Sequence, residues 1–299
     1  MKIEDKRQII NSIMEQEIQE NDLNISSFSF GRLGYYNSYY FWNKLKANKL
    51  YNPAQILTLS ALPFLNGVSR KKSKEIVVFY NDIPTPFFED SIVRLLKTTY
   101  HELYHALDDA RENDYSFDMF ANTCDRFIVS HSPIDSIKYF LTSKGHDSFM
   151  FEILANNYGI KRAEEYIEKN NISINNYEKN KLQKLKQKYE LQYQNYDLTK
   201  RLDMIINDYK VCLNCKDFDN KIFSLFLNDD SSVKNLNKVF IDENVLSLDT
   251  RILKSFLKSK KIKESLNNIK LSEEALLNIE KILDNNKSEE INDNNRKTI

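Results

Sequence analysis

The scarcity of glycine and proline is the feature that most restricts the fold of this chain. Its 299 residues contain only 5 of each. Sandwiches and barrels built from many short strands need frequent turns, and those turns draw heavily on both residue types. Hydrophobic residues make up 41% of the chain and charged residues 29%, which is ordinary for a globular protein. The sequence therefore predicts a mainly helical α+β protein with a substantial core.

Several segments carry apolar residues at spacings of three and four, the pattern of amphipathic helices. The clearest extends from about Ile92 to Leu107. Acidic residues lie near its N-terminus, where the helix dipole favours negative charge. Further helices are expected over residues 5–18, 39–45, 117–129, 132–141, 148–170, 182–196, 201–208, 250–266 and 271–283. Residues 76–80, in contrast, form a short β-branched and aromatic run that is closed by turn-forming residues, and we expect a strand there.

Composition argues against several classes of function. The formal net charge is zero, so no general basic field favours nucleic acid. No segment approaches the roughly 18 apolar residues of a membrane span, and the charged N-terminal segment lacks the apolar core of a secretory signal. The 3 cysteines include a single C-x-x-C pair, Cys212 and Cys215, too few for a disulfide framework or a complete cysteine-based zinc site. We expect a cytoplasmic protein, or one exported without a recognisable signal.

Residues 98–110, TTYHELYHALDDA, hold two of the 4 histidines in the chain. On a helix, His101 and His105 project from the same face one turn apart and can bind one cation between their imidazoles. Glu102 lies about 100° round the helix from His101, near the cation without having to bind it. This arrangement is typical of zinc hydrolases, in which the glutamate takes a proton from the metal-bound water as that water attacks a carbonyl. The sequence therefore predicts one Zn²⁺ ion, with Glu102 as the catalytic base.

A catalytic zinc site needs a third protein ligand and an open fourth position. Glu152 is the best candidate, because it lies in a separate predicted helix that an intervening helical hairpin can bring back to the first. His131, His146 and Asp109 are the alternatives. Asn156 stands one helical turn after Glu152 on the same face, and we expect it to orient that carboxylate.

Two aspartates follow the second histidine of the pair. Asp108 and Asp109 lie three and four residues after His105, and hence on its side of the helix. Either can accept the free imidazole N–H and fix the tautomer, and we expect one of them to do so. The alternative is an acidic turn exposed to solvent.

These residues resemble the lethal-factor-like zinc metalloproteases, a toxin-type gluzincin family that includes the Pro-Pro endopeptidases. The family's helix has the form His-Glu-x-x-His-Ala-(Val/Leu/Ile)-Asp, which residues 101–108 match. Its glutamate ligand lies in a later Glu-x-x-Ala helix, as Glu152 and Ala155 do here, and Glu-x-x-Ala-Asn is also similar to the ImmA/IrrE type of metallopeptidase. The likeness covers about residues 75–170. It implies a zincin-like domain in which the strand before the metal-binding helix is a sheet edge that pairs with substrate.

One position departs from that family. Its members carry a tyrosine shortly before the ligand glutamate that helps to stabilise the oxyanion, and no tyrosine stands there in LTSKGHDSFMFE. Lys144 and His146 are the polar candidates, since either can place positive charge or a donor at the developing oxyanion. His146 is therefore a candidate second catalytic residue.

The sequence predicts a zinc metalloendopeptidase that acts on a protein or peptide substrate, binds no nucleic acid and has no membrane span. A zincin-like domain is expected over residues 1–170, a helical accessory region over 171–284 and a disordered tail over 285–299. Two alternatives remain open. One is a non-catalytic helical interaction or regulatory protein that keeps a metal site, and the other is a zinc hydrolase that acts on a non-peptide amide. Oligomeric state and cleavage specificity stay open as well.

Overall fold

The chain forms two compact units in a computed structural model, which describes residues 2–32, 67–70, 74–80, 91–110, 116–132, 134–135, 143–214 and 221–282. The first unit comprises Met1–Asn113 and Pro133–Tyr196. The second comprises Asp114–Ser132 and Asp197–Ile299. Each unit therefore takes its residues from two separate stretches of the chain.

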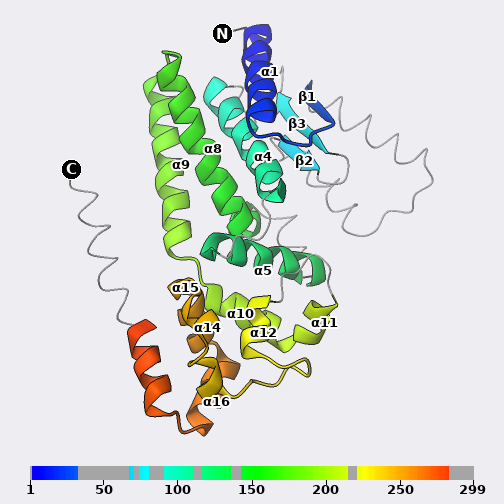
Figure 1. Ribbon diagram of the computed structural model, residues 1–299. Helices are drawn as coiled ribbons and strands as arrows, with labels where there is room; N and C mark the ends of the chain where they lie inside the picture. The colour runs from blue at the N-terminus through cyan, green and yellow to red at the C-terminus, as the bar shows by residue number, and fades with distance from the viewer. Residues whose placement is uncertain are drawn as a thin grey trace. The chain divides into compact units, whose positions relative to one another are not determined.

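The first unit consists of a small sheet and several helices (Figure 1). Its elements in chain order are α1 (Ile3–Glu20), β1 (Ser27–Arg32), β2 (Gly67–Arg70), β3 (Glu75–Tyr80), α4 (Ile92–Ala110), α7 (Ser143–His146), α8 (Met150–Lys169) and α9 (Asn176–Gln194). The three strands are ordered β1-β3-β2, with β1 parallel and β2 antiparallel to β3. Helix α4 packs against both β3 and β2, so the sheet lies directly beside the helix that carries the two histidines.

The strand predicted at residues 76–80 is present, but its expected place at a sheet edge is wrong. β3 is the central strand, because both of its sides are hydrogen-bonded to neighbours. Its residues from Ile76 to Phe79 are all buried, so both faces of the strand are covered. Within the described sheet the edge position next to α4 belongs to β2, a four-residue strand that the sequence pattern did not indicate.

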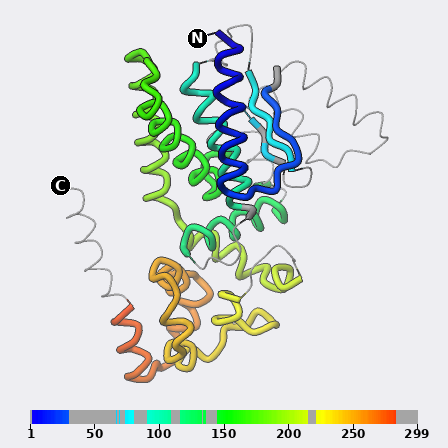
Figure 2. Tube along the Cα trace, turned by 45° about the horizontal axis from the view of Figure 1, so that its top comes forward, coloured from blue at the N-terminus to red at the C-terminus, as the bar shows by residue number. Residues whose placement is uncertain are grey.

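A single apolar core joins the sheet to the helices of the first unit. It contains Ile10 and Met14 of α1, Val78 of β3, Leu96 of α4 and Ile160 of α8. Figures 1 and 2 both show α8 and α9 running side by side, and α9 adds two buried residues to this core. The burial of these side chains is the main favourable contribution to folding of this unit.

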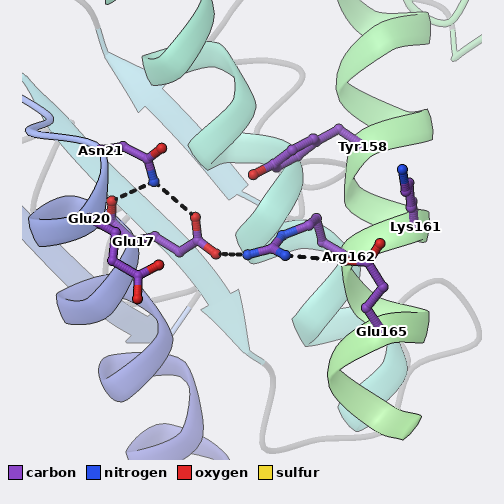
Figure 3. Close-up of a pocket in the computed structure, with 7 residues that line it drawn as sticks. All are labelled: Glu17, Glu20, Asn21, Tyr158, Lys161, Arg162 and Glu165. Atoms are coloured by element: carbon purple, nitrogen blue, oxygen red, sulfur yellow. Dashed lines mark hydrogen bonds and ion pairs between the residues drawn. The ribbon is translucent and has the colours of Figure 1, made fainter. Parts of the chain in front are cut away.

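An ion pair between a buried glutamate and a part-buried arginine ties α1 to α8 beside this core. Glu17 is only 4% exposed, and Figure 3 shows its carboxylate and the Arg162 guanidinium turned toward one another from the two helices. Asn21 donates a 3.2 Å hydrogen bond to the same carboxylate, and Arg162 also pairs with Glu165 at 3.1 Å. Each charged group of the pair thus has a second polar neighbour, Asn21 for Glu17 and Glu165 for Arg162, which helps to offset the cost of removing charge from water.

The second unit is helical, apart from one isolated bridge between Leu227 and Val233 among its described residues. Its helices are α5 (Phe117–His131), α10 (Leu198–Asn207), α11 (Tyr209–Leu213), α12 (Lys221–Phe226), α13 (Leu236–Val239), α14 (Glu243–Leu246), α15 (Thr250–Lys258), α16 (Lys260–Asn268) and a last helix over residues 273–282. Stacked aromatic rings fill its core: the Phe226 and Phe256 ring centroids lie 4.2 Å apart, with Phe120 and Phe223 beside them.

The mainly helical α+β class predicted from the sequence is confirmed, whereas the predicted division of the chain differs from the observed units. Helix α9 belongs to the first unit instead of an accessory region after residue 170, because it packs on α8. Helix α5 belongs to the second unit, because it packs on α10 and α15. The helix expected over 250–266 is two helices that meet at Ser259. The expected helix at 39–45, most of the one at 132–141 and the tail at 285–299 lie outside the described residues.

No helix in the described part of the chain is long and apolar enough to cross a membrane.

The buried pair of Asp125 and Arg201 gives a stability prediction for the second unit. Their side chains are 0% and 15% exposed, and Arg201 Nε lies 2.8 Å from Asp125 Oδ1. Arg201→Ala leaves a buried carboxylate without this cation, so we expect the free energy of unfolding to fall by about 3–5 kcal/mol. Urea denaturation measures the change. The exposed Lys258→Ala is the control and should stay within about 0.5 kcal/mol of the parent protein; equal effects for both variants would contradict the prediction.

Candidate metal centre

Two imidazoles meet on one face of α4. His101 and His105 are four residues apart on the helix, and their Nε2 atoms lie 3.2 Å from one another. Their ring planes are almost perpendicular, at 85°, with centroids 4.8 Å apart. The i, i+4 spacing of the sequence therefore produces the convergence expected of a pair of metal ligands.

Glu152 completes the group from the first turn of α8. One carboxylate oxygen, Oε2, lies 3.3 Å from His101 Nε2, and the other, Oε1, lies 3.7 Å from His105 Nε2. Among the described residues, His101, His105 and Glu152 are the one group of three or more His, Cys, Asp or Glu side chains whose ligand atoms converge in this way, all within 4.8 Å of one another. The structure thus brings together the three residues predicted as ligands.

The geometry and the burial of this group fit a bound cation. Two atoms that each lie about 2.1 Å from a tetrahedral zinc ion are about 3.4 Å apart, close to the separations found here. Burial lowers the pKa of His101 and the Glu152 carboxylate opposes it only in part, so the imidazole is held neutral, as a metal ligand must be. Burial alone raises the pKa of a carboxyl group, but the three histidines nearby hold the pKa of Glu152 below its usual range. The carboxylate is therefore ionised and able to bind a cation.

A glycine permits the close approach of α8 to α4 at this point. A Cβ atom added at Gly159 would lie 2.6 Å from the carbonyl oxygen of Lys97 and 3.1 Å from the backbone nitrogen of His101. Both are main-chain atoms, which cannot turn aside as a flexible side chain can. Glu152 lies two turns earlier on α8, so this contact fixes how far its carboxylate stands from the histidines.

Strand β2 covers Glu102. The backbone N–H of Ser69 donates to the Glu102 carboxylate, and a Cβ atom at Gly67 would lie only 2.7 Å from Glu102 Oε1. Burial, followed by the Glu152 carboxylate, raises the pKa of Glu102 to about 8 in the metal-free protein. A cation beside Glu152 would favour the ionised form of Glu102 again. Neither Gly67 nor Ser69 was identified from the sequence, because the pairing of a short strand leaves no periodic pattern.

His146, on the short helix α7, stands at the edge of the group. Its Nε2 lies 3.4 Å from Glu152 Oε1, and its Nδ1 lies 3.8 Å from Asp147 Oδ1. Burial lowers the pKa of His146, but the carboxylates of Glu152 and Asp147 outweigh that effect and leave the pKa raised. His146 was proposed from sequence as a catalytic residue and is placed beside the ligand group without belonging to it.

A lysine that sequence analysis missed also lies near the group. Lys97 precedes His101 by one turn of α4, and burial lowers its pKa to about 8 despite the opposing charge of Asp147. The negative charges of Glu152 and Glu102, like that of Asp147, raise the pKa of Lys97 and so oppose the effect of burial. Its position four residues before the first histidine, on the same helix face, is the sequence feature that indicates it.

The remaining predicted residues have varied positions. Asp108 is buried on α4, at 4% exposure, and the side chains of Asp109 and Lys144 lie outside the described residues. Asn156 is buried, but it donates to the main-chain carbonyl of Glu152 at 2.8 Å and not to its carboxylate, so the predicted orienting contact is replaced by a backbone one. His131 is exposed on α5 in the second unit, where its Nδ1 lies 3.0 Å from the Phe127 carbonyl oxygen.

Comparison of the chain with known protein families, with characterised protein sequences and with solved structures gives no match. The case for a metal centre therefore depends on the residues and geometry given above.

The close contact at Gly159 predicts the effect of a single methyl group. Alanine favours helix over glycine by about 1 kcal/mol, so Gly159→Ala should stabilise α8 if only local propensity mattered. We expect the reverse, because the added Cβ forces α8 away from α4 and moves Glu152 from the histidines. Binding of added Zn²⁺ should weaken by about 10-fold or more, measured by competition with a chelator of known affinity. The exposed Lys161→Ala on the same helix is the control, and unchanged affinity in Gly159→Ala would contradict the argument.

Proposed function

We propose that this chain is a zinc-dependent peptidase with a zincin-like catalytic unit. The observation that carries the proposal is the convergence of His101, His105 and Glu152, with Glu102 held beside them by a backbone N–H of β2. Three protein ligands are the number that catalytic zinc sites use, since the fourth position must stay open for water and substrate. Two imidazoles and one carboxylate also favour zinc over calcium or magnesium, which take oxygen ligands.

Each residue of the centre has a distinct part in this proposal. His101, His105 and Glu152 would hold the ion, which when bound would supply Lewis acidity and make a water molecule easier to deprotonate. Glu102 would accept a proton from the attacking water at its carboxylate and would release it toward the leaving amine. The Ser69 N–H fixes the carboxylate of Glu102 in place, so the base is oriented before substrate arrives.

His146 is the best-placed donor for the developing oxyanion in this proposal. Its ring lies beside Glu152 without belonging to the three-residue group, and its raised pKa favours the protonated form. In this role Nε2 would turn from Glu152 to the substrate oxygen, while Asp147 beside Nδ1 would keep the ring close to the site.

A peptide is the substrate class that the neighbouring strand favours. β2 is the outer strand of the described sheet and lies beside Glu102, and the outer strand of a sheet can bind an extended peptide through main-chain hydrogen bonds. A small non-peptide amide would gain nothing from such an edge. This is why we prefer a peptidase to an amidase acting on a small molecule.

One distance favours a second candidate, a non-catalytic protein with a closed metal site. His146 Nε2 lies 3.4 Å from Glu152 Oε1, so a modest rotation would make it a fourth ligand. Structural zinc sites have four protein ligands and no open position. A loss of bound zinc in His146→Ala as large as in Glu152→Ala would favour this second candidate, whereas a much smaller loss would favour the peptidase.

Metal content tests the ligand assignment. Purified protein should contain one zinc ion per chain, and Glu152→Ala should lose most of it during dialysis against a chelator, because one of three ligands is removed. His131→Ala is the matched control, since His131 is exposed in the second unit and should leave zinc content unchanged. Elemental analysis of each variant gives the result. Full zinc content in Glu152→Ala would show that the assignment is wrong.

Glu102→Gln tests catalysis separately from binding. Glutamine keeps the size of the side chain but cannot take a proton, so zinc content and melting temperature should be preserved. Cleavage of a peptide library, followed by mass spectrometry, should fall by about 100-fold or more. If the parent protein binds zinc but cleaves no peptide in the library, or if Glu102→Gln cleaves at the parental rate, the peptidase proposal fails.

A further inference from the structure

Helix α9 reaches the metal centre through Asp147. The carboxylate of Asp147 pairs with Lys188 of α9, whose Nζ lies 2.5 Å from Asp147 Oδ2. The hydroxyl of Tyr189, the next residue of α9, is also hydrogen-bonded to Asp147. Two consecutive residues of one helix thus hold a single carboxylate from the segment before α8.

That carboxylate is the neighbour of His146. The His146 ring lies between two acids, with Nδ1 3.8 Å from Asp147 Oδ1 and Nε2 3.4 Å from Glu152 Oε1. A carboxylate on one ring nitrogen fixes how the other nitrogen is presented, as happens for histidines around metal ions. The position of Asp147 therefore decides where His146 Nε2 lies relative to the ligand Glu152.

Tyr189 is itself rigidly held. It is 4% exposed and belongs to the apolar core of the first unit. The ammonium groups of Lys188 and Lys97 lie 4.7 Å and 5.8 Å from the centroid of its ring, within the range of cation–π attraction. A hydroxyl on a fixed ring is a more precise anchor for Asp147 than one on a mobile surface side chain.

We propose that Lys188 and Tyr189 of α9 are positioning residues for the metal centre, acting through Asp147 on His146 and thereby on Glu152. The inference rests on the proposed metal site and adds residues from a helix that the sequence pattern assigned to an accessory region. These residues do not touch the metal or the substrate. They keep the His146 ring where its Nε2 can donate to Glu152.

The same helix supplies a matched control. Lys186 of α9 pairs with Glu164 of α8 at 2.9 Å, and its side chain is 47% exposed, against 46% for Lys188. Both lysines therefore join α9 to another part of the same unit through ion pairs of similar exposure. Only the Lys188 pair leads to the metal centre, so the two substitutions separate a positioning effect from a general loss of helix packing.

The experiment measures zinc affinity of the full chain by competition with a chelator, together with melting temperature. Asp147→Asn should weaken zinc binding by about 10-fold or more, within the range typical of residues that orient metal ligands. Lys188→Gln and Tyr189→Phe should each give a smaller loss of several-fold, because each removes one of the contacts on Asp147. Lys188→Arg keeps the positive charge beside Asp147, so it should bind zinc nearly as tightly as the parent protein. Lys186→Gln should bind zinc as the parent does.

A double-mutant cycle shows whether Lys188 acts through Asp147. In the Asp147→Asn background, Lys188→Gln should have no further effect on zinc affinity. Parental affinity in Lys188→Gln, Tyr189→Phe and Asp147→Asn would overturn the inference while leaving the metal site intact. If instead the parent protein binds no zinc and His101→Ala changes nothing, the proposed function fails, and this inference fails with it.

Discussion

The close packing of α8 on α4 is the constraint on which the rest of this structure depends. The two histidines come from one helix and need only helical geometry, whereas Glu152 comes from another helix and must arrive at the right distance. Gly159 sets that distance, because its missing side chain lets α8 contact the main chain of α4 beside His101. Helix axes usually lie 8–10 Å apart according to the side chains between them, so one glycine at the contact has a direct effect on the site.

Such a centre costs stability when no cation is bound. Glu102 and Glu152 are 7% and 2% exposed, and each raises the free energy of ionising the other. Burying like charges is unfavourable unless positive groups compensate them; among the described residues, Lys97 and His146 oppose the negative charge of Glu102, and the nearby histidines oppose that of Glu152. The apolar core around α1, β3 and α8 has to offset this cost. A divalent cation in the group would instead turn the same charges into a source of stability.

The sequence predicted the local parts of the site and of the fold, but not the contacts between distant segments. His101, Glu102 and His105 follow from spacing on one helix, and Glu152 was chosen from its place in a later predicted helix, a choice that the family resemblance then supported. Strand pairing is different, since the central place of β3 depends on β1 and β2, which lie elsewhere in the chain. Helix α9 was misassigned for a similar reason. Only Leu182 and Tyr189 are buried along it, and so thin an apolar stripe does not reveal which unit it packs on.

That thin stripe also bears on the proposed coupling between α9 and the candidate metal centre. With little apolar area to bury, α9 depends on polar contacts for its exact placement, and the pair of Lys188 with Asp147 is one of them. Asp147 in turn contacts His146, which faces Glu152. Linkage makes this coupling reciprocal: if docking of α9 strengthens metal binding by a given factor, metal binding strengthens docking of α9 by the same factor. If the proposed site binds an ion, α9, which is weakly held by apolar packing, is therefore the helix whose stability we expect to respond most to that ion.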